Sequence, residues 1–226
     1  MNFPEGLFSN TWAFGAIVPF ALVYVWCLVT APWKRLAASG QINVWLGTIV
    51  VLTLMWSMKA GVKPGLNLHL LGATAFTLMF GRQLAIIGLS LVLAAVTYNS
   101  GEVGTAMGWQ PYALNALVMA VFPCLMACLI LRAVERWLPP NVFVYIFAAS
   151  FFGAAAVTLC TGLLATTTLW LADVYSAEVL WSDYFPYYIL LGFSEAWLNG
   201  GAITLMIVYF PSWVGSFDDR RYLWNK

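Results

Sequence analysis

Two ionisable side chains lie inside long apolar stretches of this chain, where an ionisable group is costly and usually has a function. Glu195 lies in the apolar stretch from Tyr187 to Phe210. His69 is the only histidine, and it lies near the start of the stretch from Leu66 to Phe80. The first question is therefore whether these side chains bind a cation, transfer a proton or only hold helices together.

His69 has candidate partners at the N-terminus. The sequence Pro4-Glu5-Gly6 predicts a turn that folds the first residues back, and the large side chain of Asn2 predicts that Met1 is kept with a free amine. The Met1 amine, the backbone nitrogen of Asn2 and the imidazole are three nitrogen donors, which suit Ni(II) or Cu(II) in a planar site. Asn2 adds its side-chain oxygen or only orients the chain. The alternative is a hydrogen-bonded structural histidine at a helix start.

Glu195 has a functional and a structural interpretation. As a functional group it pairs with a cation or relays a proton. As a structural group it accepts hydrogen bonds from Ser194, Asn115 or the amine of Met1, and so fastens helices together. We predict the structural role rather than direct ligation of an ion.

Two cysteines form a second candidate site. Cys124 and Cys128 are four residues apart and share one face of a predicted helix. With Met119 or Met126 they would suit a soft ion such as Cu(I). Cysteines that face a packed bundle are more often small packing residues, so this site stays the lesser alternative.

The composition indicates which elements must position these residues. Of the 226 residues, 62% are hydrophobic and 8% are charged, whereas soluble domains carry roughly 25% charged residues. A membrane-spanning helix needs about 20 apolar residues. We predict an all-α, polytopic membrane helix bundle of about seven transmembrane helices that forms one domain over residues 1–226. The apolar segments are 11–30, 42–58, 66–80, 84–98, 112–131, 142–172 and 187–210.

The positions of lysine and arginine predict the orientation, because cytoplasmic loops are enriched in these residues. An N-out, C-in arrangement places eight of the ten basic residues inside. It makes residues 1–10 an outer segment and residues 211–226 a cytoplasmic tail. The inner residues are Lys34, Arg35, Arg82, Arg132, Arg136, Arg220, Arg221 and Lys226, and the outer ones are Lys59 and Lys63.

Several function classes lack their motifs. The sequence has no phosphate-binding loop, no Gly-x-Ser-x-Gly and no His-Glu-x-x-His. We therefore predict no enzyme and no organic cofactor, and any ATPase is a separate polypeptide. A net charge of +1 indicates no nucleic-acid partner. The surrounding partner is membrane lipid.

Four segments resemble, in the same order, the CbiM/NikM membrane proteins, which are the substrate-binding components of energy-coupling-factor cobalt and nickel importers. They are Met1-Asn-Phe-Pro-Glu-Gly, the region around His69, Leu114-Asn115-Ala-Leu-Val-Met119, and Gly192-Phe-Ser-Glu195-Ala-Trp. The resemblance implies a seven-helix bundle in which the N-terminus enters from outside. It implies that Met1, residue 2 and His69 hold the ion, with Asn115 and Glu195 as support. One departure is Asn2, where the family has histidine.

We predict a substrate-binding or permease component of a divalent transition-metal uptake system in the bacterial inner membrane. Its substrate is a cobalt or nickel ion, with copper as a further candidate. A coupling membrane subunit and ATPase subunits are its partners. Asn2 motivates the alternative, which is a non-transporting membrane scaffold or accessory subunit that keeps the family fold without high-affinity metal binding. A membrane enzyme that uses Glu195 as acid or base has no second catalytic partner in the sequence.

Overall fold

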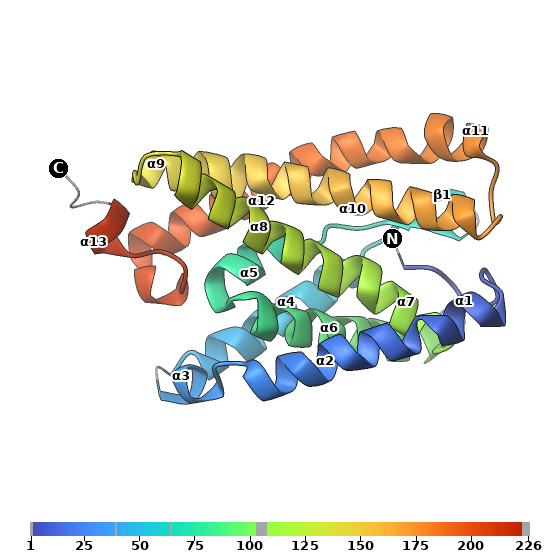
Figure 1. The fold of residues 1–226 in the computed structure, drawn as a ribbon, viewed down its shortest axis with the longest axis horizontal. Coiled ribbons are helices and arrows are strands. Elements are labelled where there is room, and N and C mark those ends of the chain that lie inside the picture. The colour runs from blue at the N-terminus through green and yellow to red at the C-terminus, as the bar shows by residue number, and fades with distance from the viewer. Residues whose placement is uncertain (1, 39, 64, 103–107, 223–226) are drawn as a thin grey trace.

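The structure is a computed structural model that describes residues 2–38, 40–63, 65–102 and 108–222. Its long helices run roughly along one common direction (Figure 1). On one side of the bundle α10 (Phe152–Leu171) packs on α12 (Phe185–Tyr209), and on the other α6 (Arg82–Glu102) packs on α2 (Ile17–Thr30) and α4 (Ile42–Ser57). The short helix α5 (Ala73–Phe80) lies between the two groups, against α6, α8 (Phe122–Trp137), α10 and α12.

A helical membrane bundle is confirmed. Among the described residues, five helical stretches are long and apolar enough to cross a bilayer, and α4 is a shorter apolar helix. Many of their large apolar side chains are exposed, as a lipid environment requires. The first two stretches are Asn10–Thr30, which contains α1 (Asn10–Gly15) and α2, and Arg82–Ser100 in α6. The third is Tyr112–Trp137, which contains α7 (Tyr112–Ala116), η1 (Leu117–Val121) and α8. The last two are Val142–Leu171, which contains α9 (Val142–Val144), η2 (Tyr145–Phe151) and α10, and Ala177–Tyr209, which contains α11 (Ala177–Val179), η3 (Leu180–Tyr184) and α12.

The predicted third span, 66–80, is not a membrane-length helix. Its first part is the strand β2 (Leu66–Leu68), which pairs antiparallel with β1 (Ala60–Lys63), and only its last eight residues form α5. The prediction of helix was wrong for residues 66–72 and holds for residues 73–80, because an apolar stretch does not distinguish a buried helix from a buried strand and loop. Gly65, with φ +78°, supplies the left-handed backbone of the hairpin turn.

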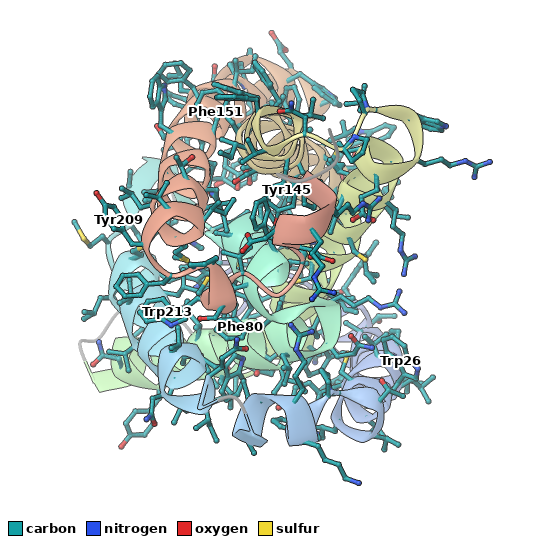
Figure 2. All side chains as sticks on the ribbon, turned by 90° about the vertical axis from the view of Figure 1, so that its left-hand side faces the viewer. Trp26, Phe80, Tyr145, Phe151, Tyr209 and Trp213 are labelled. Atoms are coloured by element: carbon teal, nitrogen blue, oxygen red, sulfur yellow. The ribbon has the colours of Figure 1, made fainter. Side chains whose placement is uncertain are left out.

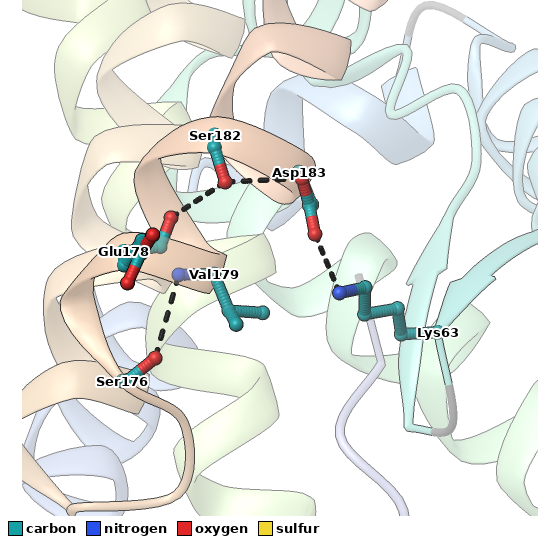
Figure 3. A network of polar contacts seen from close by, with 6 residues as sticks. All are labelled: Lys63, Ser176, Glu178, Val179, Ser182 and Asp183. Atoms are coloured by element: carbon teal, nitrogen blue, oxygen red, sulfur yellow. Dashed lines mark hydrogen bonds and ion pairs between the residues drawn. The ribbon is translucent and has the colours of Figure 1, made fainter.

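The β1–β2 hairpin is held by its neighbours, because an isolated two-stranded hairpin is only marginally stable. Gly65 lies against Pro4 and Leu7 of the N-terminal segment. Lys63 forms an ion pair with Asp183 of η3, which Ser182 contacts in turn (Figure 3). We call this end of the bundle the hairpin end.

Helix α5 is capped at both ends by segments that come from far along the chain. Seven of its eight residues are buried. The backbone N–H groups of Gly215 and Ser216 donate to the carbonyl oxygens of Met79 and Leu78, at 2.9 and 3.1 Å. These bonds satisfy carbonyl groups that a helix C-terminus leaves without partners.

The last described residues close the other end of the bundle, which we call the tail end. After η4 (Pro211–Trp213) the chain folds back to α13 (Asp219–Tyr222). Phe217, which precedes α13, and Tyr222 both pack on Tyr145. Arg221 pairs with Glu135 at 2.8 Å. Figure 2 looks onto this end, with the buried Tyr145 near the centre.

Close helix contacts depend on glycine, as expected for a bundle in lipid. A Cβ atom added at Gly162 of α10 would lie 2.3 Å from the ring of Tyr188 on α12. Tyr188 is fully buried, and its hydroxyl group hydrogen-bonds that of Tyr184 at 2.8 Å. Gly162 therefore lets α10 and α12 approach each other.

Candidate metal centre

The N-terminal segment before α1 folds back into the bundle at the hairpin end (Figure 1). The backbone N–H of Leu7 donates to the carbonyl of Pro4 at 3.4 Å, and Gly6 has φ +78°. This is the turn that Pro4-Glu5-Gly6 predicts. Asn2 and Phe3 are 0% and 1% exposed. The turn thus places the start of the chain in the protein interior.

Asn115 of α7 holds the backbone of this segment. The N–H of Phe3 donates to Asn115 Oδ1 at 2.9 Å, and Asn115 Nδ2 donates to the carbonyl of Phe3 at 3.0 Å. Nearer the surface, Gln110 Oε1 accepts from the N–H of Gly6 at 3.1 Å. Asn115 therefore lies where a support of the site was predicted, and it fixes the residue that follows Asn2.

His69 meets the N-terminal segment in the loop between β2 and α5. Its Nε2 atom lies 3.0 Å from Asn2 Oδ1, and its Nδ1 atom lies 3.0 Å from the carbonyl oxygen of Leu70. A carbonyl only accepts, so Nδ1 carries a proton and, in the neutral ring, Nε2 carries the lone pair. Burial lowers the pKa of His69 well below its usual value and favours this neutral form. The lone pair on Nε2 of the imidazole is thus available to a metal ion.

Glu195 holds the loop that carries His69. Its carboxylate accepts hydrogen bonds from the backbone N–H of Leu71 and from that of Gly72, the latter at 3.1 Å. Asn199 Nδ2 also donates to it, at 2.7 Å. Glu195 is 1% exposed and has no ion-pair partner among the described residues. These donors hold both carboxyl oxygens of Glu195, and Gly72 provides the left-handed turn (φ +65°) before α5.

The hydrogen bonds of Glu195 join α12 to the loop before α5, and its partners differ from the predicted ones. Ser194 donates to the carbonyl of Leu190 on its own helix, and Asn115 bonds Phe3 instead. Met1 lies outside the described residues, so its predicted contacts stay predictions.

Two residues of the site were missed. Asn199 Oδ1 accepts from the N–H of Ala75 at 2.8 Å and so caps the first turn of α5. It follows Glu195 by four residues on one helix face, a spacing that the sequence does show. Trp56 is fully buried, donates Nε1 to the carbonyl of Leu71 at 3.0 Å and packs its ring 4.7 Å from that of His69. No spacing in the sequence indicates this contact.

The second candidate site has fewer donors. Cys124 is buried and Cys128 half-buried on α8, and both are free thiols. Within the described part of the chain, no group of three or more His, Cys, Asp or Glu side chains is placed to hold a metal ion. An ion at His69 would therefore take its other ligands from groups such as amides or an amine.

The fold is similar to that of two solved structures. A structure described as a truncated transition metal transporter has a TM-score of 0.70 at 17% sequence identity, covering 92% of this chain and 99% of that chain. A second, described as a transition metal transporter, has a TM-score of 0.68 at 17% identity, covering 91% and 92%. At this identity the likeness establishes the architecture of the bundle.

The sequence defines the family. The model of the CbiM family, described as the cobalt uptake substrate-specific transmembrane region, matches residues 2–213. The chain therefore belongs to this family, and the predicted resemblance is confirmed. A comparison with curated proteins gave no match. The chain is thus a membrane component of a transition-metal uptake family, a class of transporter rather than of enzyme.

Proposed function

We propose that this protein is the substrate-binding component of a cobalt or nickel uptake transporter. Its ion is held by the amine of Met1, the backbone nitrogen of Asn2 and Nε2 of His69. The observation that carries the proposal is the 3.0 Å contact between Asn2 and His69, which brings the start of the chain to its only histidine. Membership of the CbiM family supports the same assignment.

The surrounding hydrogen bonds position the two halves of the site independently. Asn115 fixes the segment that carries Asn2, and Glu195 fixes the loop that carries His69. Hydrogen-bonded supports of this kind orient metal ligands and typically contribute 10- to 100-fold to affinity. Residues 1–9 precede the first helix, so we propose that their undocking opens the site and their docking closes it.

The distribution of charge supports an N-out, C-in orientation. Lys34 and Arg35 on α3 (Trp33–Ala38) lie at the tail end with the last turn of α8 and with α13. Lys63 ends β1 at the hairpin end, and Lys59 directly precedes β1. We propose that residues 1–226 form one domain in the bacterial inner membrane with the tail end cytoplasmic, where a coupling membrane subunit and ATPase subunits act. Asp218 and residues 219–222 give this end both signs of charge.

The residue type at position 2, asparagine, favours one alternative function. Without an imidazole at this position the site has fewer strong nitrogen donors. The alternative function is a membrane scaffold or accessory subunit that keeps the bundle and binds no metal with high affinity.

Metal analysis of the purified protein separates the two functions. We expect about one equivalent of cobalt or nickel in the wild type after equilibration and removal of free ion, and none in His69→Ala, because Nε2 is a ligand. Equal metal contents in the two proteins would contradict the proposal. No metal in either would support the scaffold. Monodisperse gel filtration of His69→Ala serves as the folding control.

A further inference from the structure

Helix α5 is a short rigid element with a glycine at each end. Gly72 precedes it with φ +65° and Gly81 follows it with φ +80°, and a positive φ of this kind favours glycine. The helix packs against α6, α8, α10 and α12, and seven of its eight residues are buried. Hinges are typically a few residues at the ends of an element. Gly72 and Gly81 therefore allow α5 to move as one body, which connects the groups bound at its two ends.

The start of α5 is fastened to α12 beside the candidate metal centre. Glu195 accepts a hydrogen bond from the N–H of Gly72 at 3.1 Å, and Asn199, one turn later, accepts from the N–H of Ala75 at 2.8 Å. His69 lies in the same loop, just before Gly72. An ion bound at His69 would therefore also restrict the start of α5.

The end of α5 is fastened to residues 211–222, which we call the C-terminal segment. The carbonyl of Leu78 accepts from both the N–H and the hydroxyl of Ser216, at 3.1 and 2.7 Å. The carbonyl of Met79 accepts from the N–H of Gly215 at 2.9 Å. An α-helix of this length spans about 12 Å, so these bonds lie at the far end of α5 from the candidate metal centre.

The C-terminal segment is docked by few buried contacts. Its residues are all described, and the buried ones among them are Val214 and Tyr222. Because the hydroxyl of Ser216 donates to a carbonyl, it accepts in turn from the hydroxyl of the buried Tyr145, at 2.7 Å. Segments with few buried contacts open at a low cost in free energy. The C-terminal segment is therefore the part of this assembly that a partner protein can displace most readily.

We propose that α5 couples the ion site to the C-terminal segment. A bound ion strengthens the docking of the segment on α5, and a partner protein that displaces the segment lowers the affinity of the site for its ion. This inference rests on the proposed function and gives its ion site a means of release. The coupling membrane subunit, which we place at the tail end, is the partner that would use it. Such coupling is reciprocal and typically changes an affinity by roughly 5- to 150-fold.

Hydrogen–deuterium exchange of the purified, full-length protein with and without cobalt chloride tests the first half of the coupling. We expect the amides of Gly215 and Ser216 to exchange about fivefold or more slowly when cobalt is bound. The amides of α2 serve as the internal reference and should exchange equally in both samples. This comparison needs no variant, so it does not depend on any change in folding.

A double variant at the far end of α5 tests the second half. Tyr145→Phe with Ser216→Ala keeps the buried ring and removes both hydroxyl groups that hold the C-terminal segment. We expect faster exchange at Gly215 and cobalt binding about fivefold or more weaker, measured by competition with a chelating indicator. Tyr209→Phe with Ser212→Ala changes two exposed residues in the same way. This matched control should bind cobalt like the wild type.

The variant Glu195→Gln tests the coupling from the other end and without an ion. It weakens the bonds that hold the start of α5, so we expect faster exchange at Gly215 and Ser216 in the ion-free protein. Exchange in α2 at the wild-type rate shows that this variant is folded.

Two sets of results separate failure of the coupling from failure of the proposed function. If the wild type binds cobalt, unchanged exchange at Gly215 and Ser216 together with wild-type affinity of the double variant would overturn the coupling and leave the proposed function standing. If the wild type binds no cobalt, the proposed function fails, and Glu195→Gln decides the coupling alone. Unchanged exchange at Gly215 in that variant would then overturn it.

Discussion

The docking of the N-terminal segment depends on Asn115, and the substitution Asn115→Leu tests this dependence. Leucine keeps a similar size but removes both hydrogen bonds to Phe3, at 2.9 and 3.0 Å. Asn115 and Phe3 are 3% and 1% exposed, so water does not replace these bonds while the segment stays docked. The backbone N–H and carbonyl of Phe3 would both be left without partners in the interior.

The magnitude follows from these two groups. An unsatisfied buried donor or acceptor costs about 1–3 kcal/mol, so the two together cost about 2–6 kcal/mol. If this cost exceeds the docking free energy of the segment, the segment undocks and water hydrogen-bonds the backbone of Phe3. The measurable loss therefore cannot exceed the docking free energy. A loss of about 2–4 kcal/mol corresponds to a change of roughly 30- to 1000-fold in the ratio of docked to undocked protein.

Hydrogen–deuterium exchange of the purified protein measures this ratio directly. We expect the peptide that contains Phe3 to exchange much faster in Asn115→Leu, while the peptides of α10 exchange as in the wild type. Gln110→Ala is the graded control: its bond to Gly6 is exposed, so exchange should rise only slightly. Unchanged exchange at Phe3 in Asn115→Leu would refute the role of Asn115, and faster exchange in α10 as well would indicate global unfolding instead.

Three further substitutions test the surrounding structure. Glu195→Gln replaces one acceptor oxygen by a donor that faces other donors, so we expect metal affinity to fall about 10- to 100-fold; an unchanged titration would show that the loop is held by other contacts. Gly162→Ala places a methyl group 2.3 Å from the ring of Tyr188, and we expect about 1–3 kcal/mol of destabilisation in thermal unfolding. A stability equal to that of the wild type would mean that α10 and α12 separate without cost. Lys63→Met removes an ion pair whose two side chains are only partly buried, and it should change stability and metal affinity little, whereas a large loss would make the hairpin part of the site.

The features that the sequence predicted correctly depend on local chemistry. Turn residues dictate the fold of the first segment, because Pro4 and Gly6 fix backbone angles that few other residues adopt. The apolar stretches around Glu195 and Asn115 are long and uninterrupted, so their helices follow from length alone. Asn2 and His69 were correctly predicted to meet, because both lie at the same end of the bundle.

The missed features depend on distant contacts. The stretch 66–80 is as apolar as a helix, but its backbone forms a strand and a loop whose N–H groups are satisfied by Glu195, more than 120 residues away. No periodicity of apolar residues in the sequence indicates such a distant partner. The contact between Trp56 and His69 was missed for the same reason: the hairpin returns the chain to α4, and the sequence alone did not indicate a hairpin.

The central claim is that the start of this chain and its only histidine bind one ion together. The most direct measurement is the metal stoichiometry of a protein that carries extra residues before Met1 and that inserts and purifies like the wild type. The account predicts that the extension abolishes stoichiometric binding, because it converts the amine into an amide and crowds a buried segment. Retention of one tightly bound ion in the extended protein would contradict it.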